Sequence, residues 1–294
     1  MNQAWPTLPY AEWKDTKDTL HMYAQIVGKT ALSHSPRINH WWNCGLEVTE
    51  RGLSTPLLYE DDVPFRIELD FIEHELHVFA KKQQTQSFRL GDSVAGFYEI
   101  FKRAMHYSVL HPRIWPVPVE IANGIPFKED TQHATYNPES VERFHQLLLS
   151  VQRVLNRFRA GYCGKCSPVL FWWGTFDICV TRFSGRPAPP REDADSILRE
   201  AMSHEEISCG WWPGDDTTPE AYFYAYAAPE PGGIGEQRLL PSEAFYSAEK
   251  QEFFLPYEAV RTSTNPEQKA LDFFQSTYDA GANLGNWDSG LVRS

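Results

Sequence analysis

The densest group of ionisable side chains in this sequence is Ser203-His204-Glu205-Glu206, with Cys209 shortly after it. A histidine beside carboxylates exchanges protons near neutral pH, because neighbouring groups readily move its pKa from about 6.5. We therefore expect His204 to act as a general acid or base, with Glu205 orienting its ring. The alternative is a solvated helix end at which these side chains face water.

A second candidate group lies in the apolar run from Leu170 to Arg182. Asp177 interrupts this run, and a carboxylate in such a strand is usually paired or faces a cavity. We therefore add Asp177 to the candidate catalytic residues. Arg182 is either its buried partner or, like Lys165, an anchor for an anionic group of a substrate.

Aromatic side chains supply candidate stacking surfaces for a ligand. Trp41-Trp42 and Trp172-Trp173 stand where strands are predicted to start, so alternation turns one ring of each pair inward and the other outward. The outward ring either stacks on a ligand or covers a neighbouring helix. The candidate substrate-binding residues are Arg182, Lys165, Trp42, Trp173, Trp212 and His40, with Tyr224 as a further stacking surface.

The motif Cys163-Gly164-Lys165-Cys166 is a C-x-x-C, which is typical of half a zinc site or of a redox pair. A structural zinc site would need His204 and Cys209 to fold back onto it. The five cysteines are an odd number in a chain with no expected export signal, and this favours reduced thiols. We predict no metal site and leave the cofactor open.

One series of motifs occurs twice in the sequence and predicts the elements that must position these residues. Residues 5–49 contain Trp-Pro, Pro-aromatic, Asp-Thr-x-His, Gly-Lys, Ser-Pro, Trp-Trp and Thr, and residues 115–181 contain the same series in the same order. Such an order indicates two copies of one supersecondary unit. The repeated Asp-Thr-x-His either lines a shared site or caps two helices, and we favour capping, with Gly28 ending the first helix.

Hydrophobic periodicity predicts the elements of both units. Helices are expected over residues 18–29, 94–104, 141–158 and 270–278, and strands over residues 65–71, 76–78, 170–182, 221–227 and 252–255. Strand runs bracketed by helices indicate an α+β fold with antiparallel sheets. We predict two pseudo-repeated helix–sheet–helix units, residues 1–113 and 114–294, packed into one compact pseudo-symmetric body.

The two units differ most at residues 184–220, where the second unit is much longer than the first. We predict an inserted loop there, with a short helix near residues 195–202. Long loops within compact domains tend to be lids or binding loops. The loop would then cover a cleft between the two units.

Composition narrows the classes of partner. The net charge of -12 disfavours nucleic acids and anionic membranes as partners, because both require concentrated Lys and Arg. No apolar run approaches the roughly 20 residues of a membrane span or resembles a signal peptide. We expect a cytoplasmic protein that binds a small molecule, and its oligomeric state stays open.

The chain resembles the bacterial family known as domain of unknown function 5996. The resemblance rests on Trp5-Pro-x-Leu-Pro-Tyr, Ile26-Val-Gly-Lys, Asn39-His-Trp-Trp, Ile114-Trp-Pro-x-Pro-Val-Glu-Ile, Gly164-Lys-Cys-Ser-Pro-Val, residues 171–186, Ser203-His-Glu, Cys209-Gly-x-Trp-Pro-Gly and Tyr246-Ser-Ala-Glu. It implies a stand-alone bacterial protein and supplies no substrate, because the family has no assigned activity.

Three functions are compatible with these residues. The first is an enzyme acting on a small polar or aromatic substrate in a cleft between the two units. The second is a non-catalytic small-molecule binding protein with an aromatic-lined pocket. The third is an interaction protein stabilised by a metal. The sequence leaves open whether the protein is an enzyme.

Overall fold

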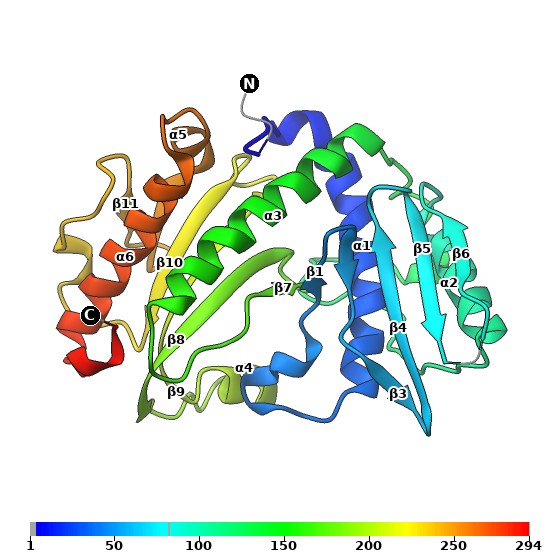
Figure 1. Ribbon diagram of the computed structural model, residues 1–294, viewed down its shortest axis with the longest axis horizontal. Helices are drawn as coiled ribbons and strands as arrows, with labels where there is room; N and C mark the ends of the chain where they lie inside the picture. The colour runs from blue at the N-terminus through cyan, green and yellow to red at the C-terminus, as the bar shows by residue number, and fades with distance from the viewer. Residues whose placement is uncertain (1–3, 82, 294) are drawn as a thin grey trace.

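A computed structural model describes residues 4–81 and 83–293 (Figure 1). The α-helices are α1 (Tyr10–His34), α2 (Val94–Tyr107), α3 (Pro138–Ala160), α4 (Ser196–Ala201), α5 (Tyr257–Arg261) and α6 (Pro266–Leu284). The 3-10 helices are η1 (Asn39–Cys44), η2 (Phe127–Glu129), η3 (Ile234–Glu236) and η4 (Ser289–Leu291).

The strands form two sheets. The first sheet contains β1 (Glu47–Val48), β2 (Gly52–Ser54), β3 (Leu58–Glu60), β4 (Val63–Asp70), β5 (Glu75–Ala80) and β6 (Gln86–Arg89). The second contains β7 (Leu170–Trp172), β8 (Asp177–Pro187), β9 (His204–Trp212), β10 (Tyr222–Ala228), β11 (Phe245–Ser247) and β12 (Glu252–Pro256), in the order β11-β12-β10-β9-β8-β7. Every strand pair is antiparallel, which confirms the α+β prediction.

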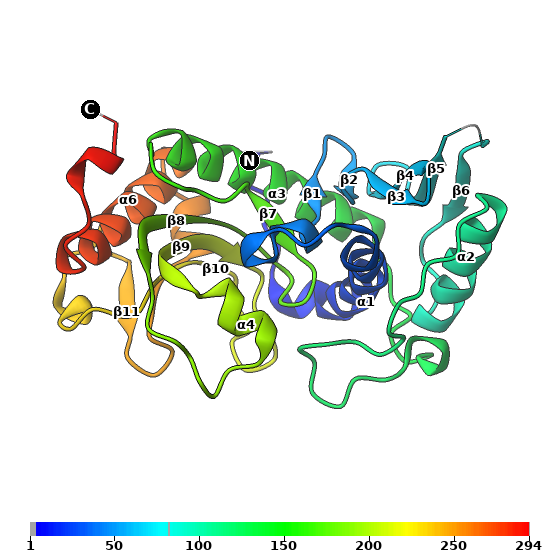
Figure 2. The same ribbon diagram turned by 90° about the horizontal axis from the view of Figure 1, so that it is seen from below.

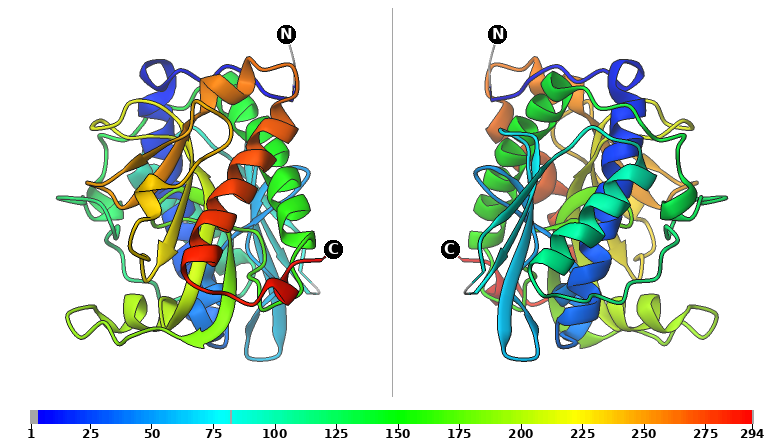
Figure 3. Two further views of the ribbon diagram at one scale, coloured as in Figure 1. Left: turned by 90° about the vertical axis from the view of Figure 1, so that its left-hand side faces the viewer. Right: turned by 90° about the vertical axis from the view of Figure 1, so that its right-hand side faces the viewer.

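Helices cover one face of each sheet. Helices α1 and α2 pack against the first sheet, as the right-hand view of Figure 3 shows. Helices α3 and α6 lie on one face of the second sheet, and α4 lies on the opposite side (Figure 2). The second sheet thus has one face in the core and one face free of long helices.

Alternation along the strands produces this division. In β8 and β9 the apolar side chains of Ile178, Val180, Ile207 and Trp211 are buried in the core. The ring of Phe144 in α3 lies 6.2 Å from that of Trp211. Because successive strand residues point to opposite faces, the residues between them must face the other side.

Helix α1 differs from its predicted limits. It begins at Tyr10, so Asp18 and Thr19 lie inside it and do not cap its start. The helix also continues past Gly28 to His34. The indole of Trp173 lies against this glycine, and an added Cβ would be 2.1 Å from a ring carbon. Gly28 is therefore a site of close packing and does not end the helix.

The segment expected as an inserted loop contains a central strand. Residues 204–212 form β9, which pairs with β8 on one side and β10 on the other. The short helix expected near residues 195–202 is present as α4. Between β8 and β9, residues 188–203 form a connection that contains α4. The division into two units and the internal duplication stay predictions. Within residues 4–81 and 83–293, no helix has the length and apolar character that crossing a membrane requires.

Candidate functional site

The face of the second sheet opposite α3 and α6, here called the polar face, carries ionisable and aromatic side chains. Strand pairing places Phe183, Glu206 and Ala228 in one row across the sheet, and Thr181, Ser208 and Tyr226 in the next. The hydroxyls of Thr181 and Ser208 lie 3.1 Å apart, as expected for neighbours on one face. Residues Cys179, Gly210 and Tyr224 form the third row.

At one end of this face, residues from distant parts of the chain form what we call the His40 cluster, which consists of His40, Trp42, Lys165, Phe183 and His204. Lys165 Nζ lies 2.5 Å from His40 Nε2. The His40 ring lies 4.4 Å from the Phe183 ring and 5.4 Å from the His204 ring. Lys165 also lies over the ring of Trp42, at 5.5 Å.

Hydrogen bonding determines which nitrogen of His40 carries the proton. His40 Nδ1 lies 2.8 Å from the carbonyl oxygen of Ala201, and a carbonyl oxygen can only accept. The proton is therefore on Nδ1, and Nε2 has a free lone pair that accepts a hydrogen bond from Lys165. Lys165 is thus the donor and His40 the acceptor of this hydrogen bond.

Helix η1 holds His40 in an unusual backbone conformation. Both His40 and Trp41 are left-handed, with φ of 57° and 58°. Arg37 lies over the Trp41 ring at 4.8 Å and forms an ion pair with Glu200 of α4. Residues 39–44 therefore form short 3-10 turns on either side of a kink at His40 and Trp41, and Trp41-Trp42 is not the predicted start of a strand.

Burial changes the protonation of this end of the polar face. Burial lowers the pKa of Lys165, whereas the charge of Glu206 acts in the opposite direction. Burial raises the pKa of Glu206 to about 8, against the attraction of Arg191 and Lys165. Burial also lowers the pKa of His40, and Lys165 and His204 add to that lowering. At neutral pH, Glu206 is therefore protonated and His40 is neutral.

Asp177 lies on the same face toward its other end. Its carboxylate accepts hydrogen bonds from the hydroxyls of Thr175 and Tyr224. Burial raises its pKa to about 6, although these two hydrogen bonds lower it. Tyr224 reaches Asp177 by crossing Gly210, where an added Cβ would lie 2.6 Å from the tyrosine hydroxyl.

The two ends of the polar face are separate sites. Asp177 and Phe183 are six residues apart on β8, which corresponds to about 20 Å of extended strand. Between them lie the parallel rings of Tyr224 and Tyr226, with centroids 6.4 Å apart. A small molecule in contact with the His40 cluster therefore cannot also contact Asp177.

Glu205 does not lie beside His204 as expected, because adjacent residues of a strand face opposite sides. Its carboxylate forms an ion pair with Arg186 at 2.6 Å and accepts a hydrogen bond from Ser184 at 2.8 Å. Within β9, the carboxyl group that lies on the same face as His204 is that of Glu206. We therefore do not assign Glu205 the role of orienting His204.

Arg182 and Trp173 are packed in the core. The guanidinium of Arg182 lies 3.4 Å from the centre of the Phe158 ring and 4.5 Å from that of Tyr278, on the helix-covered face. It is 1% exposed, so it is not accessible to a substrate. Trp173 donates a hydrogen bond from Nε1 to the carbonyl of Cys44 at 2.7 Å. Trp212 is half-buried and paired with Tyr222 at the Asp177 end of the sheet.

The sequence-based candidate site residues did not include Glu206, Phe183 or Tyr226, which lie on the polar face. The alternation of tyrosine with Phe223, Ala225 and Ala227 could have identified the tyrosine face of β10. Residues 206–211 likewise alternate, with Ile207, Cys209 and Trp211 as the apolar positions. Reading this segment as a strand would have selected Glu206 as the companion of His204.

The cysteines do not assemble a metal site in the part of the chain that the structure describes. No three His, Cys, Asp or Glu side chains there are placed to hold a metal ion. Cys209 points into the core and His204 to the polar face, so the proposed zinc ligands are on opposite sides of β9. All five cysteines are free thiols.

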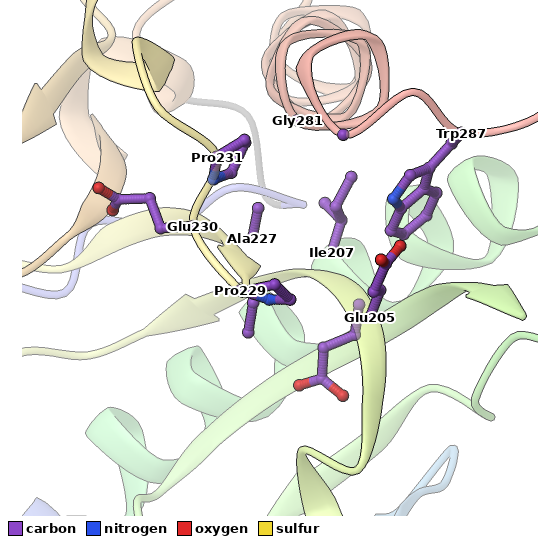
Figure 4. A pocket seen from close by; sticks show the side chains of 11 residues that line it. Glu205, Ile207, Ala227, Pro229, Glu230, Pro231, Gly281 and Trp287 are labelled. Carbon is purple, nitrogen blue, oxygen red and sulfur yellow. The ribbon is translucent and has the colours of Figure 1, made fainter. Parts of the chain in front are cut away.

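Two hollows lie near the start of β9. One, of about 380 Å³, is bordered by Glu205, Ile207, Ala227, Gly281 and Trp287, and the Glu205 carboxylate approaches the indole of Trp287 (Figure 4). The other, of about 440 Å³, lies between residues 188–191, Met202 and Ala228-Pro229. Because Ala228 pairs with Glu206, this second hollow borders the polar face next to the His40 cluster.

Comparison with known proteins identifies a family and no characterised relative. The family model described as "Family of unknown function (DUF5996)" matches residues 5–294. No curated protein and no solved structure matches the chain.

Proposed function

The chain belongs to family DUF5996, whose function is unknown, and we propose from the geometry that it is an enzyme acting on a small polar or aromatic substrate at the His40 cluster. The observation that carries this proposal is the 2.5 Å contact between Lys165 Nζ and His40 Nε2. An amine and an imidazole in direct contact can pass a proton between them near neutral pH. The substrate would lie between η1 and the second sheet.

Each member of the cluster has a role in this proposal. Lys165 binds a polar group of the substrate, and Trp42 and Phe183 form the walls around it. His204 lies 5.4 Å from His40 across the same space and acts as the general acid or base. Glu206 is protonated at neutral pH and donates a hydrogen bond.

Asp177 is the second proton-exchanging group of the polar face. Its pKa of about 6 suits a group that changes charge near neutral pH. It lies about 20 Å from the cluster along β8, so a small substrate cannot use both. We therefore assign the chemistry to the His40 cluster and give Asp177 no part in it.

The parallel rings of Tyr224 and Tyr226 favour one other function, which is binding without catalysis. Their hydroxyls and faces lie on the same surface as Asp177, and stacked aromatic side chains commonly hold planar or sugar-like ligands. In this case the ligand would bind near Tyr224 and would not depend on Lys165.

We also propose that the protein acts in the bacterial cytoplasm. Five free cysteines and a net charge of -12 support a reducing compartment without an anionic membrane partner.

A panel of small metabolites tests the proposal through the thermal stability of the protein. A ligand that binds only the folded state raises the melting temperature, and the stabilisation grows with the ratio of the free ligand concentration to its Kd. We expect at least one anion or carbonyl compound to stabilise the wild type but not Lys165→Met. The matched control is Lys102→Met, which removes an exposed lysine from α2 and should leave the response unchanged.

A ligand that stabilises Lys165→Met as well as the wild type would contradict the assignment to the His40 cluster. If the same ligand failed to stabilise Tyr224→Phe, it would favour the binding function at the other end of the face.

A further inference from the structure

The surroundings of Lys165 differ from those of other lysines in the described chain. Lys14 and Lys102 lie 2.7 and 2.5 Å from carboxylate oxygens of Asp216 and Glu99. The contact with Asp216 raises the pKa of Lys14. The hydrogen-bond partner of Lys165 is instead an uncharged ring nitrogen. This partner can accept a proton from the amine.

Aromatic rings shield the same amine from water. Its nitrogen lies 4.9 Å from the centre of the Phe183 ring and 5.5 Å from that of Trp42. A less hydrated ammonium loses its proton more readily, and the resulting amine is a nucleophile. The hydrogen bond to Ala201 keeps the accepting lone pair of His40 directed at this amine.

Lys165 also remains accessible. It is half-buried, whereas Lys29, another lysine against an indole, is only 6% exposed beneath Trp173. A reagent of modest size can therefore reach Lys165. Accessibility, a proton acceptor and aromatic walls together are what a covalent lysine needs.

We propose that Lys165 forms a Schiff base with an aldehyde or ketone, so that the substrate class is a carbonyl compound. This deepens the proposed function and rests on it. The polar substrate group that Lys165 binds is then a carbonyl group.

The step balances with residues of the cluster. His40 Nε2 takes a proton from the Lys165 ammonium, and the amine lone pair attacks the carbonyl carbon. A proton then moves from the attacking nitrogen to the former carbonyl oxygen, which gives a neutral carbinolamine. The imidazolium then returns its proton to the departing hydroxyl, which leaves as water. The product is a protonated imine on Lys165, and the total charge is unchanged.

Reductive trapping with benzaldehyde or glyoxylate and cyanoborohydride tests this proposal. The hydride converts the imine into a stable secondary amine, and peptide mass spectrometry then locates it. At about pH 7 we expect Lys165 of the native protein to be labelled at least about tenfold faster than Lys102, because more of it is unprotonated. Labelling of Lys165 at the same rate as Lys102 would overturn the proposal.

His40→Asn tests the proton acceptor. Asparagine tolerates the left-handed backbone at this position but lacks the ring nitrogen. In folded His40→Asn, labelling of Lys165 should slow about tenfold because no ring nitrogen takes the proton of the ammonium, with His204 and Glu206 as the remaining titratable groups facing the amine. An unchanged rate would overturn the role of His40.

Outcomes for the two proposals are distinguishable. A ligand that requires Lys165 for thermal stabilisation but forms no reducible adduct would contradict the Schiff base alone. The comparison of Lys165 with Lys102 takes place within one native sample, so it does not depend on whether His40→Asn folds.

Discussion

Burial sets the protonation of individual carboxyl groups on the polar face. Glu206 is 5% exposed and its pKa is raised to about 8, and Glu252 is raised to about 7 for the same reason. An acid whose pKa is higher in the folded state binds more protons there than in the unfolded chain. The contribution of such an acid to the free energy of unfolding is therefore fully present at low pH and is lost as the pH rises through its folded-state pKa.

This linkage gives a prediction for Glu206→Gln. The amide keeps the shape of the protonated acid, so the variant should match the wild type at about pH 4 and exceed its stability at about pH 8, by on the order of 3 kcal/mol. Denaturant unfolding across this range measures the difference. The matched control is Glu205→Gln on the opposite face of β9, where the ion pair with Arg186 predicts no such gain at high pH.

At the level of residues, the sequence predicted which side chains could take part in a reaction more readily than which side chains contact one another. His40, Trp42, Lys165 and His204 were all candidates, and the structure brings them together. The pairing of His204 with Glu205 was wrong because it assumed that neighbours in sequence face the same way. Arg182 could not be assigned to the core from sequence, since only the fold places Phe158 and Tyr278 around its guanidinium.

Helix α1 is positioned by a close contact with the loop after β7. The Trp173 ring occupies the space beside Gly28, and its Nε1 donates a hydrogen bond to the carbonyl oxygen of Cys44, the last residue of η1. This one indole links α1, η1 and the second sheet. The position of His40 in η1 thus depends on the packing of Gly28.

Gly28→Ala should therefore be destabilising. In an exposed helix this change stabilises by up to about 1 kcal/mol, but here the methyl group would overlap the indole and cost about 2 kcal/mol or more. Thermal unfolding measures the effect. Gly161→Ala is the control, because the nearest atom to its Cβ is 3.5 Å away and we expect little change. A stabilised Gly28→Ala protein would contradict the packing described.

Elements with clear periodicity were predictable. Helices α2, α3 and α6 follow from their apolar stripes, and Asn137 caps α3 as its position before Pro138 suggests. Strand β9 was not predicted because residues 184–220 were assigned to an inserted loop from the difference in length between the two units. Gly210 is in fact required within the strand, since the Tyr224 ring crosses it to reach Asp177.

Across the whole molecule, the second sheet separates a layer of packed helices from the polar face. Helices α3 and α6 fill one side with apolar side chains, and the polar face with α4 lies on the other (Figure 2). The His40 cluster joins η1 from the first half of the chain to β8 and β9 from the second. A site between two repeated units stays a prediction that the sequence suggests from the repetition of its motifs.

The most direct test of the account is a crystal structure with a ligand obtained from the metabolite panel or retained through purification. We predict that the ligand lies on the polar face, in contact with Lys165 and His40 and between the rings of Trp42 and Phe183. A ligand bound instead in the hollow between Glu205 and Trp287, with Lys165 and His40 uncontacted, would contradict the assignment of the functional site.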